Sequence, residues 1–124
     1  DKWVLVDVPY SGSFFGGIIH ENIIYFFGMR GNIVSANLDL FSKNHHKRTQ
    51  MIFNRHTTPS KLGIMSAGID KDGSLIFFGS GGIAHRFSDG VFSLKKAILD
   101  TVVSTAENGG VTFYVGLKGI KTIK

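Results

Sequence analysis

The chain has 124 residues and a net charge of +5, with 43% hydrophobic and 19% charged residues. This length supports one domain with one core, and this composition excludes a disordered tail. The absence of cysteine excludes disulfides, thiolate catalysis and cysteine-based metal sites, and no apolar run in the sequence is long enough for a membrane-spanning helix.

Glycine and phenylalanine are the residues in excess. The chain contains 16 Gly and 11 Phe but only 2 Pro. Such a composition indicates many tight turns that join aromatic strands, and it disfavours long helices. The predicted fold class is therefore all-β.

The first predicted element is a lone strand over 2–9. Its apolar side chains alternate, with Trp3 and Leu5 on one face and Val4 and Val6 on the other. No hairpin partner follows it directly in the sequence. We expect this strand to pair with the last part of the chain.

From Phe26 onward the sequence repeats itself. The phrases "FFGMRGNIV", "FFGSGGIAH" and "YVGLKGIKT" share a Gly-x-x-Gly whose first glycine is Gly28, Gly79 or Gly116. The spacings, 51 residues from Gly28 to Gly79 and 37 from Gly79 to Gly116, lie around the repeat length of propeller blades.

Each repeat is predicted to begin with a hairpin. A strand, a tight turn and a second strand precede every Gly-x-x-Gly, and the turns fall at 20–22, 71–73 and 107–110. The Gly-x-x-Gly then makes a second turn, in which the glycines adopt backbone angles that the residues between them need not adopt. Third strands follow at 32–37, 83–89 and 120–124.

Outer, fourth strands are predicted for two repeats. They are "KRTQMIFN" at 47–54 and "VFSLKKAIL" at 91–99. In the second, Leu94, Ala97 and Ile98 also fit one or two helical turns, but we favour a strand. The third repeat ends without a fourth strand, so the strand at 2–9 is expected to complete it and close the ring.

The sequence therefore predicts a single β-propeller-type domain over 1–124 with three four-stranded blades. The blades cover about 11–58, about 61–100, and about 102–124 together with the strand at 2–9. Three blades are too few to close a ring, since known propellers have about four to eight. Either two chains form a six-bladed ring, or the chain is part of a longer propeller. The alternative fold is an open stack of β-sheets or a small sandwich.

The phrases "YSGSFFGG" and "FFGMRGNIVSA" resemble the bacterial BNR/Asp-box propellers related to photosystem II stability and assembly factors. The resemblance covers most of the chain from Tyr10 to Gly119 and is strongest over 11–35. It implies a scaffold or assembly factor without hydrolase activity, exported or periplasmic, with a cytoplasmic location left open. The Asp-boxes themselves are degenerate. They are reduced to Ser35, Asp39 and Phe41 in "SANLDLF" and to 88–92 in "FSDGVF", which favours structural turns over a ligand site.

The residues of the chain do not fit the patterns of a sialidase site, a zinc site or a phosphate loop. A sialidase would need an arginine cluster, a Tyr–Glu pair and an Asp acid, but Glu21 and Glu107, the two glutamates, fall in predicted turns. The histidines lack the paired spacing of zinc ligands and are interpreted as solvated or turn residues: His20, His45, His46, His56 and His85. The Gly-x-x-Gly turns are followed by strands rather than by helices, as a phosphate loop would require. We expect no catalytic residue, no metal and no cofactor.

The candidate binding site is the rim formed by the Gly-x-x-Gly turns. In a propeller the loops between second and third strands share one rim, which would bring together Arg30, Ser80 and Lys118, with Tyr10 and Phe14 beside them. Arginine and tyrosine are favoured anchors of protein interfaces. The alternative is that Arg30 only covers turn backbone and water.

The partner expected for this rim is a protein, acidic or part of a membrane-associated complex, because the chain is basic. Nucleic acid is not expected, since the basic run "HHKR" at 45–48 has no aromatic stacking platform interleaved with it. The leading function is a non-enzymatic scaffold. The alternative is a carbohydrate-binding or glycosidase-derived Asp-box propeller, which would need exposed rings such as Tyr10 or Tyr25.

Overall fold

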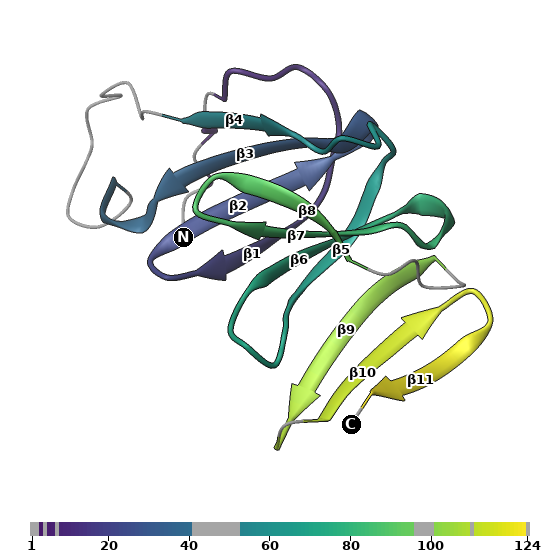
Figure 1. Ribbon diagram of the computed structural model, residues 1–124. Helices are drawn as coiled ribbons and strands as arrows, with labels where there is room; N and C mark the ends of the chain where they lie inside the picture. The colour runs from purple at the N-terminus through teal and green to yellow at the C-terminus, as the bar shows by residue number, and fades with distance from the viewer. Residues whose placement is uncertain are drawn as a thin grey trace.

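The computed structural model describes residues 3, 5–6, 8–40, 53–95, 101–109 and 111–123. These ranges contain eleven strands and no α-helix (Figure 1). All pairs of neighbouring strands are antiparallel, and the strands form three separate sheets. The prediction of an all-β fold is confirmed.

Each sheet is a meander in which strands follow one another in chain order. Sheet 1 contains β1 (Phe14–His20), β2 (Ile23–Gly28), β3 (Asn32–Asn37) and β4 (Asn54–Thr57). Sheet 2 contains β5 (Ile64–Ile69), β6 (Leu75–Gly79), β7 (Ala84–Ser88) and β8 (Val91–Lys95). Sheet 3 contains β9 (Val102–Asn108), β10 (Val111–Gly116) and β11 (Gly119–Ile123).

The predicted hairpin turns determine this register. Between β1 and β2, Glu21 and Asn22 have φ of 51° and 63°, so that His20 pairs with Ile23. Two consecutive left-handed residues match the right-handed twist of the flanking strands. Between β5 and β6, Gly73 at φ 84° completes the turn. Glu107, which was predicted to be a turn residue, lies instead within β9, one position before its end.

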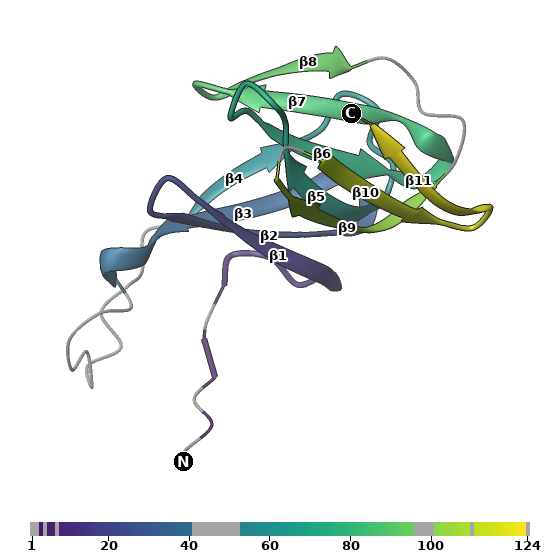
Figure 2. The same cartoon turned by 90° about the horizontal axis from the view of Figure 1, so that it is seen from below.

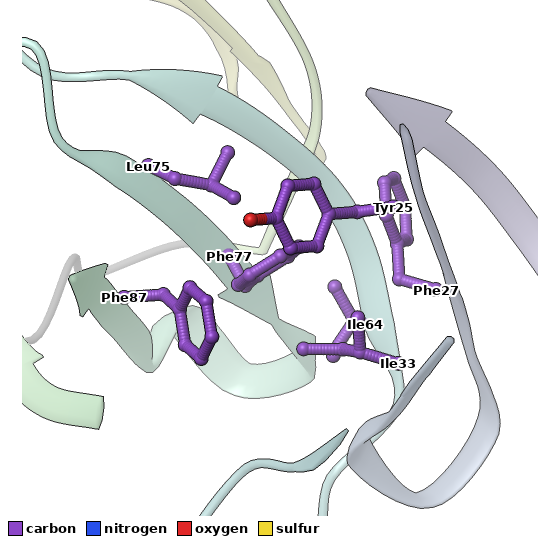
Figure 3. Packing of buried hydrophobic residues seen from close by; sticks show 7 residues of the cluster. All are labelled: Tyr25, Phe27, Ile33, Ile64, Leu75, Phe77 and Phe87. Carbon is purple, nitrogen blue, oxygen red and sulfur yellow. The ribbon is translucent and has the colours of Figure 1, made fainter. Parts of the chain in front are cut away.

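The core between sheets 1 and 2 is built on the alternation of β6. Leu75 and Phe77 point toward sheet 1, where Phe77 is 1% exposed and its ring centroid lies 6.0 Å from those of Tyr25 and Phe27. Figure 3 shows these side chains meeting between the two sheets. The core comprises Tyr25, Phe27, Ile33, Ile64, Leu75, Phe77 and Phe87.

The other face of β6 belongs to a second core. Ile76 and Phe78 point toward sheet 3, and the ring of Phe78 lies 5.6 Å from that of Tyr114. Hydrogen bonds join the same two sheets, from Ser66 Oγ to the Val102 carbonyl at 2.7 Å and from Thr105 Oγ1 to the Ala67 carbonyl at 3.1 Å. Sheet 2 is therefore covered on both faces, and all five positions of β6 are buried.

The first strands of the three sheets lie side by side. β5 contacts β1 on one side and β9 on the other, and Figure 2 shows the three strands next to one another. Of the later strands, β4 lies at the upper left in Figure 1 and β8 lies at the top in Figure 2. Sheet 2 thus packs against sheet 1 on one face and against sheet 3 on the other.

Three sequence predictions need correction or restriction. The outer strand of sheet 1 is β4 at Asn54–Thr57, so it begins where the predicted strand at 47–54 ends. Residues 47–52 lie outside the described residues. In the second repeat, the predicted strand at 91–99 is present as β8 up to Lys95, and 96–99 are not described. The described residues of the predicted strand at 2–9 are not in a strand, and Trp3 and Leu5 are exposed. Sheet 3 consequently has three strands among the described residues.

Candidate functional site

The first Gly-x-x-Gly turn presents Arg30 to solvent. The turn is a short 3-10 segment, Met29–Gly31, between β2 and β3. Gly31 has φ 73°, but Arg30 has φ 57°, so the expectation that residues between the glycines avoid left-handed angles is wrong for Arg30. The Asn32 side chain holds this strained turn by donating a hydrogen bond from Nδ2 to the Met29 carbonyl at 3.0 Å.

Tyr10 and Phe14 lie beside this turn. The Tyr10 hydroxyl accepts a hydrogen bond from Asn32 Nδ2 at 3.4 Å, and its ring packs edge-on against Phe14 with centroids 5.2 Å apart. The Arg55 guanidinium lies 6.0 Å from the centre of the Tyr10 ring. Both aromatic side chains are half-buried. They therefore support the turn of Arg30 and show solvent only one edge.

A chain of backbone hydrogen bonds places Ser80 on the same rim. The Thr58 amide donates to the Gly31 carbonyl at 2.9 Å, and the Ser80 amide donates to the Gly63 carbonyl at 2.8 Å. The loop 58–63 thus connects the Arg30 turn with the turn Ser80–Gly82.

Lys118 lies in the corresponding turn of sheet 3. The Gly81 amide donates to Thr101 Oγ1 at 3.0 Å, next to Val102, which pairs with Gly116 just before the β10–β11 turn. Figure 1 shows the turns that follow β2, β6 and β10 on one side of the molecule. The five predicted site residues are therefore brought to one rim, although Ser80 is only partly exposed.

We call this end of the sheets the basic rim. Its exposed cations are Arg30, Lys61 and Lys118. Exposed apolar side chains lie among them, with Met29 40% exposed, Leu62 39% and Leu117 78%. Of these residues, Arg30 and Met29 are of types enriched at protein interfaces.

The opposite end of the sheets carries the negative charge. All six described carboxylates lie there, in or next to the turns after β1, β3, β5, β7 and β9: Glu21, Asp39, Asp70, Asp72, Asp89 and Glu107. Hydrogen bonds join these turns, from His20 Nε2 to the Gly73 carbonyl at 2.8 Å and from the Leu38 amide to the Asn22 carbonyl at 2.9 Å. We call this end the acidic rim. Sequence reasoning interpreted its acidic residues only as turn formers and missed their common location.

Asp70 is the most strongly perturbed of these carboxylates. Burial opposes its ionisation, but hydrogen bonds from Lys95, the Lys71 amide and Arg86 outweigh this effect and lower the pKa of Asp70 to about 2. Its Oδ2 lies 2.7 Å from Lys95 Nζ and 2.8 Å from Arg86 Nη2. Asp70 is therefore ionised at neutral pH, and its charge is balanced by the ion pairs with Lys95 and Arg86.

A cleft of about 430 Å³ opens between sheets 1 and 2 at the acidic rim. Ser35 and Tyr25 line its inner part, and Ser35 Oγ lies 3.2 Å from His56 Nε2. Burial lowers the pKa of His56, so its imidazole is neutral at pH 7. Residues from the two sheets form the walls: His20, Glu21, Ile23, Asn54, Asp72, Gly73, Ser74, Phe87, Ser88, Asp89 and Gly90. No motif or spacing in the sequence indicates this cleft.

The histidines differ from the prediction that they are solvated or in turns. His56 is half-buried in β4 against the ring of Phe87, with centroids 5.1 Å apart. His85 is 5% exposed in β7, and neither of its ring nitrogens has a hydrogen-bond partner in the described part of the chain. Its burial lowers its pKa. His45 and His46 lie outside the described residues.

Within the described ranges, no three histidine or acidic side chains are grouped so as to hold a metal ion. The same ranges contain no helix long and apolar enough to cross a membrane. In comparisons with known proteins, no protein-family model and no curated protein matches the chain.

Proposed function

We propose that the chain is a three-blade β-propeller module that acts as a non-enzymatic scaffold and binds a protein partner through the basic rim. The observation that carries the propeller arrangement is the environment of β6. Its side chains alternate between two cores, and all five positions are buried. Neighbouring blades of a propeller cover a middle blade in this way, and first strands side by side fit the same arrangement.

The outer faces of the end sheets support the incomplete-ring part of the proposal. On the face of sheet 3 turned away from sheet 2, Ile120 is 71% exposed and Phe113 and Val115 are each 39% exposed. On the corresponding face of sheet 1, Ile19 on the edge strand β1 is 57% exposed, while Val34 and Ala36 on β3 are already buried. A further blade would bury such faces. We propose that a second copy supplies it, so that each sheet 3 packs on the other chain's sheet 1 and two chains close a six-bladed ring.

Solution mass measured by light scattering on a sizing column tests the ring. We expect twice the monomer mass for the native chain and the monomer mass for Ile120→Glu. Val91→Glu is the matched control, because Val91 is 66% exposed on the edge strand β8. A native chain that stays monomeric at concentrations near 100 μM, a range in which standard-sized interfaces associate, would contradict closure by a second copy.

The protein-binding part of the proposal rests on the basic rim. Arg30 stands on a turn fixed by Asn32 and is exposed next to Met29, which is itself 40% exposed. No described carboxylate shares this end of the sheets, since all six lie at the acidic rim. An acidic protein surface is the complementary partner, and the complementarity would raise its association rate as well as its affinity.

Affinity capture with charge reversal tests this surface. Arg30→Glu reverses an exposed charge at the basic rim, and Lys71→Glu reverses an exposed charge at the acidic rim. We expect Arg30→Glu to lose at least tenfold in affinity for a captured partner while Lys71→Glu binds like the native chain. If both variants retain the partner equally at unchanged thermal stability, the basic rim is not the binding surface.

The carbohydrate alternative has little support at the two tyrosines that it needs. Tyr25 is 6% exposed within the core and cannot stack on a sugar, and Tyr10 is half-buried against Phe14. We therefore keep protein binding as the proposed function.

A further inference from the structure

The cleft at the acidic rim carries an inference that goes beyond the scaffold function. Three of the carboxylates line it, Glu21, Asp72 and Asp89, and no lysine or arginine is among its lining residues. Glu21 and Asp89 have no ion-pair partner in the described part of the chain, whereas Asp72 lies 3.7 Å from Arg86 Nη1. The charged side chains that line this cleft are therefore all acidic, which favours a cationic ligand.

The hydroxyl of Tyr25 is a second, independent sign of a ligand. Tyr25 is 6% exposed and lines the cleft, yet within the described residues no hydrogen bond reaches its hydroxyl. Figure 3 shows this hydroxyl extending from β2 across the space between the sheets. Burial, followed by the negative charge of Glu21, raises the pKa of Tyr25, so the group stays neutral. The ring packs in the core while the residue also lines the cleft, so a bound head group can hydrogen-bond with its hydroxyl.

The remaining walls suit an alkyl stem with a polar head. Ile23 and Phe87 supply apolar surface, and Ser35, Asn54 and the neutral His56 supply hydrogen-bonding groups. Long cationic side chains bury their methylene groups on such surfaces and keep the charged head near carboxylates or ring faces. A volume of about 430 Å³ accommodates one such stem and head.

We propose that this cleft binds an organic cation, a guanidinium or primary ammonium group on a short alkyl stem. Glu21 and Asp89 neutralise the charge at the mouth, and the Tyr25 hydroxyl accepts a hydrogen bond from the head group. The cation can be an arginine or lysine side chain of a peptide or a free amine, which offer the same chemistry. The proposal does not depend on the basic rim, since the two surfaces lie at opposite ends of the sheets.

Calorimetric titration with three probes tests the proposal on the full chain. Agmatine represents the free cation, an acetylated and amidated arginine tripeptide represents the protein side chain, and methyl glucoside represents a neutral polyol. We expect agmatine or the tripeptide to bind and the glucoside not to bind. Binding of both cationic probes identifies the head group alone as the ligand, and binding of the tripeptide only identifies a peptide segment.

Variants then locate the site. Glu21→Gln and Asp89→Asn each remove one negative charge. Both residues have left-handed φ; glutamine tolerates this angle as well as glutamate does, and asparagine favours it. Each should weaken binding about tenfold, the effect of one charged hydrogen bond. Glu107→Gln is the matched control, because it removes an exposed carboxylate of the acidic rim that does not line the cleft. Tyr25→Phe keeps the ring and its packing and should weaken binding severalfold without loss of stability.

Three results would overturn the proposal. Binding of the glucoside without either cation would make the cleft a polyol site. Equal weakening by Glu107→Gln and Glu21→Gln would show attraction by the overall field and not a built site. Absence of binding by every probe at millimolar concentration would leave the Tyr25 hydroxyl and the carboxylates without a ligand role.

Discussion

Truncation of Phe77 is the most direct test of how the sheets pack. Phe77 is 1% exposed at the centre of the core between sheets 1 and 2. Its ring lies 6.0 to 6.5 Å from those of Tyr25, Phe27, Phe87 and Phe92. Phe77→Ala removes the buried ring and leaves a cavity that four other rings line, so the cost should reach the upper part of the usual range, about 4 to 5 kcal/mol.

Phe113→Ala is the comparison, since Phe113 lies 39% exposed on the outer face of sheet 3. Part of its surface is already in water, so we expect a cost of about 1 kcal/mol. Phe77→Leu should cost about 1.5 kcal/mol and keeps the measurement possible if the alanine variant does not fold. Urea titration gives the free energy of unfolding and its m-value for each variant. Equal costs at Phe77 and Phe113 would refute the stacking of sheet 1 on sheet 2.

Two further predictions concern a turn and a titration. Gly31→Ala should destabilise the fold by about 2 to 4 kcal/mol, because φ is 73° and the new Cβ would overlap Thr58 Oγ1. Gly81→Ala has a similar φ of 78°, but its Cβ meets no atom within 4 Å, so it should cost about 1 kcal/mol. Thermal melts of both variants measure this difference. Asp70 has a folded pKa of about 2, below its ordinary value of 3.8, so its contribution to stability is complete above pH 4 and is lost as pH falls from 3.8 toward 2. Asp70→Asn should cost about 1 to 2 kcal/mol at pH 7 and should reduce the loss of unfolding free energy between pH 3.8 and 2, measured by denaturant titrations. If the variant loses as much stability over this pH range as the native chain, the ion pairs of Asp70 with Arg86 and Lys95 are contradicted.

The sequence was most informative where one local rule determines the backbone. The third strand of the first repeat, Asn32–Asn37, has the predicted bounds, because a glycine turn precedes it and sets its first residue. Prediction failed where pairing is non-local. The segment at 2–9 offers apolar side chains on both of its predicted faces, yet its described residues are not in a strand, since such a pattern does not specify a pairing partner.

The candidate sites show the same division. The common rim of Arg30 and Lys118 follows from the repeat, because equivalent turns of stacked meanders point the same way. The cleft depends on contacts between sheets that no spacing encodes, such as His20 on the Gly73 carbonyl and Ser35 on His56. A count of acidic residues in the predicted first hairpin turns would have been the available signal for the acidic rim.

The separation of charge between the two rims gives the described part of the molecule a permanent dipole along its strands. All six described carboxylates lie at one end, and Arg30, Lys61 and Lys118 lie at the other. Within a Debye length of an anionic surface, about 8 to 10 Å in physiological salt, the charges of the described residues favour an approach with the basic rim first. In that orientation the cleft between sheets 1 and 2 faces outward into the solution.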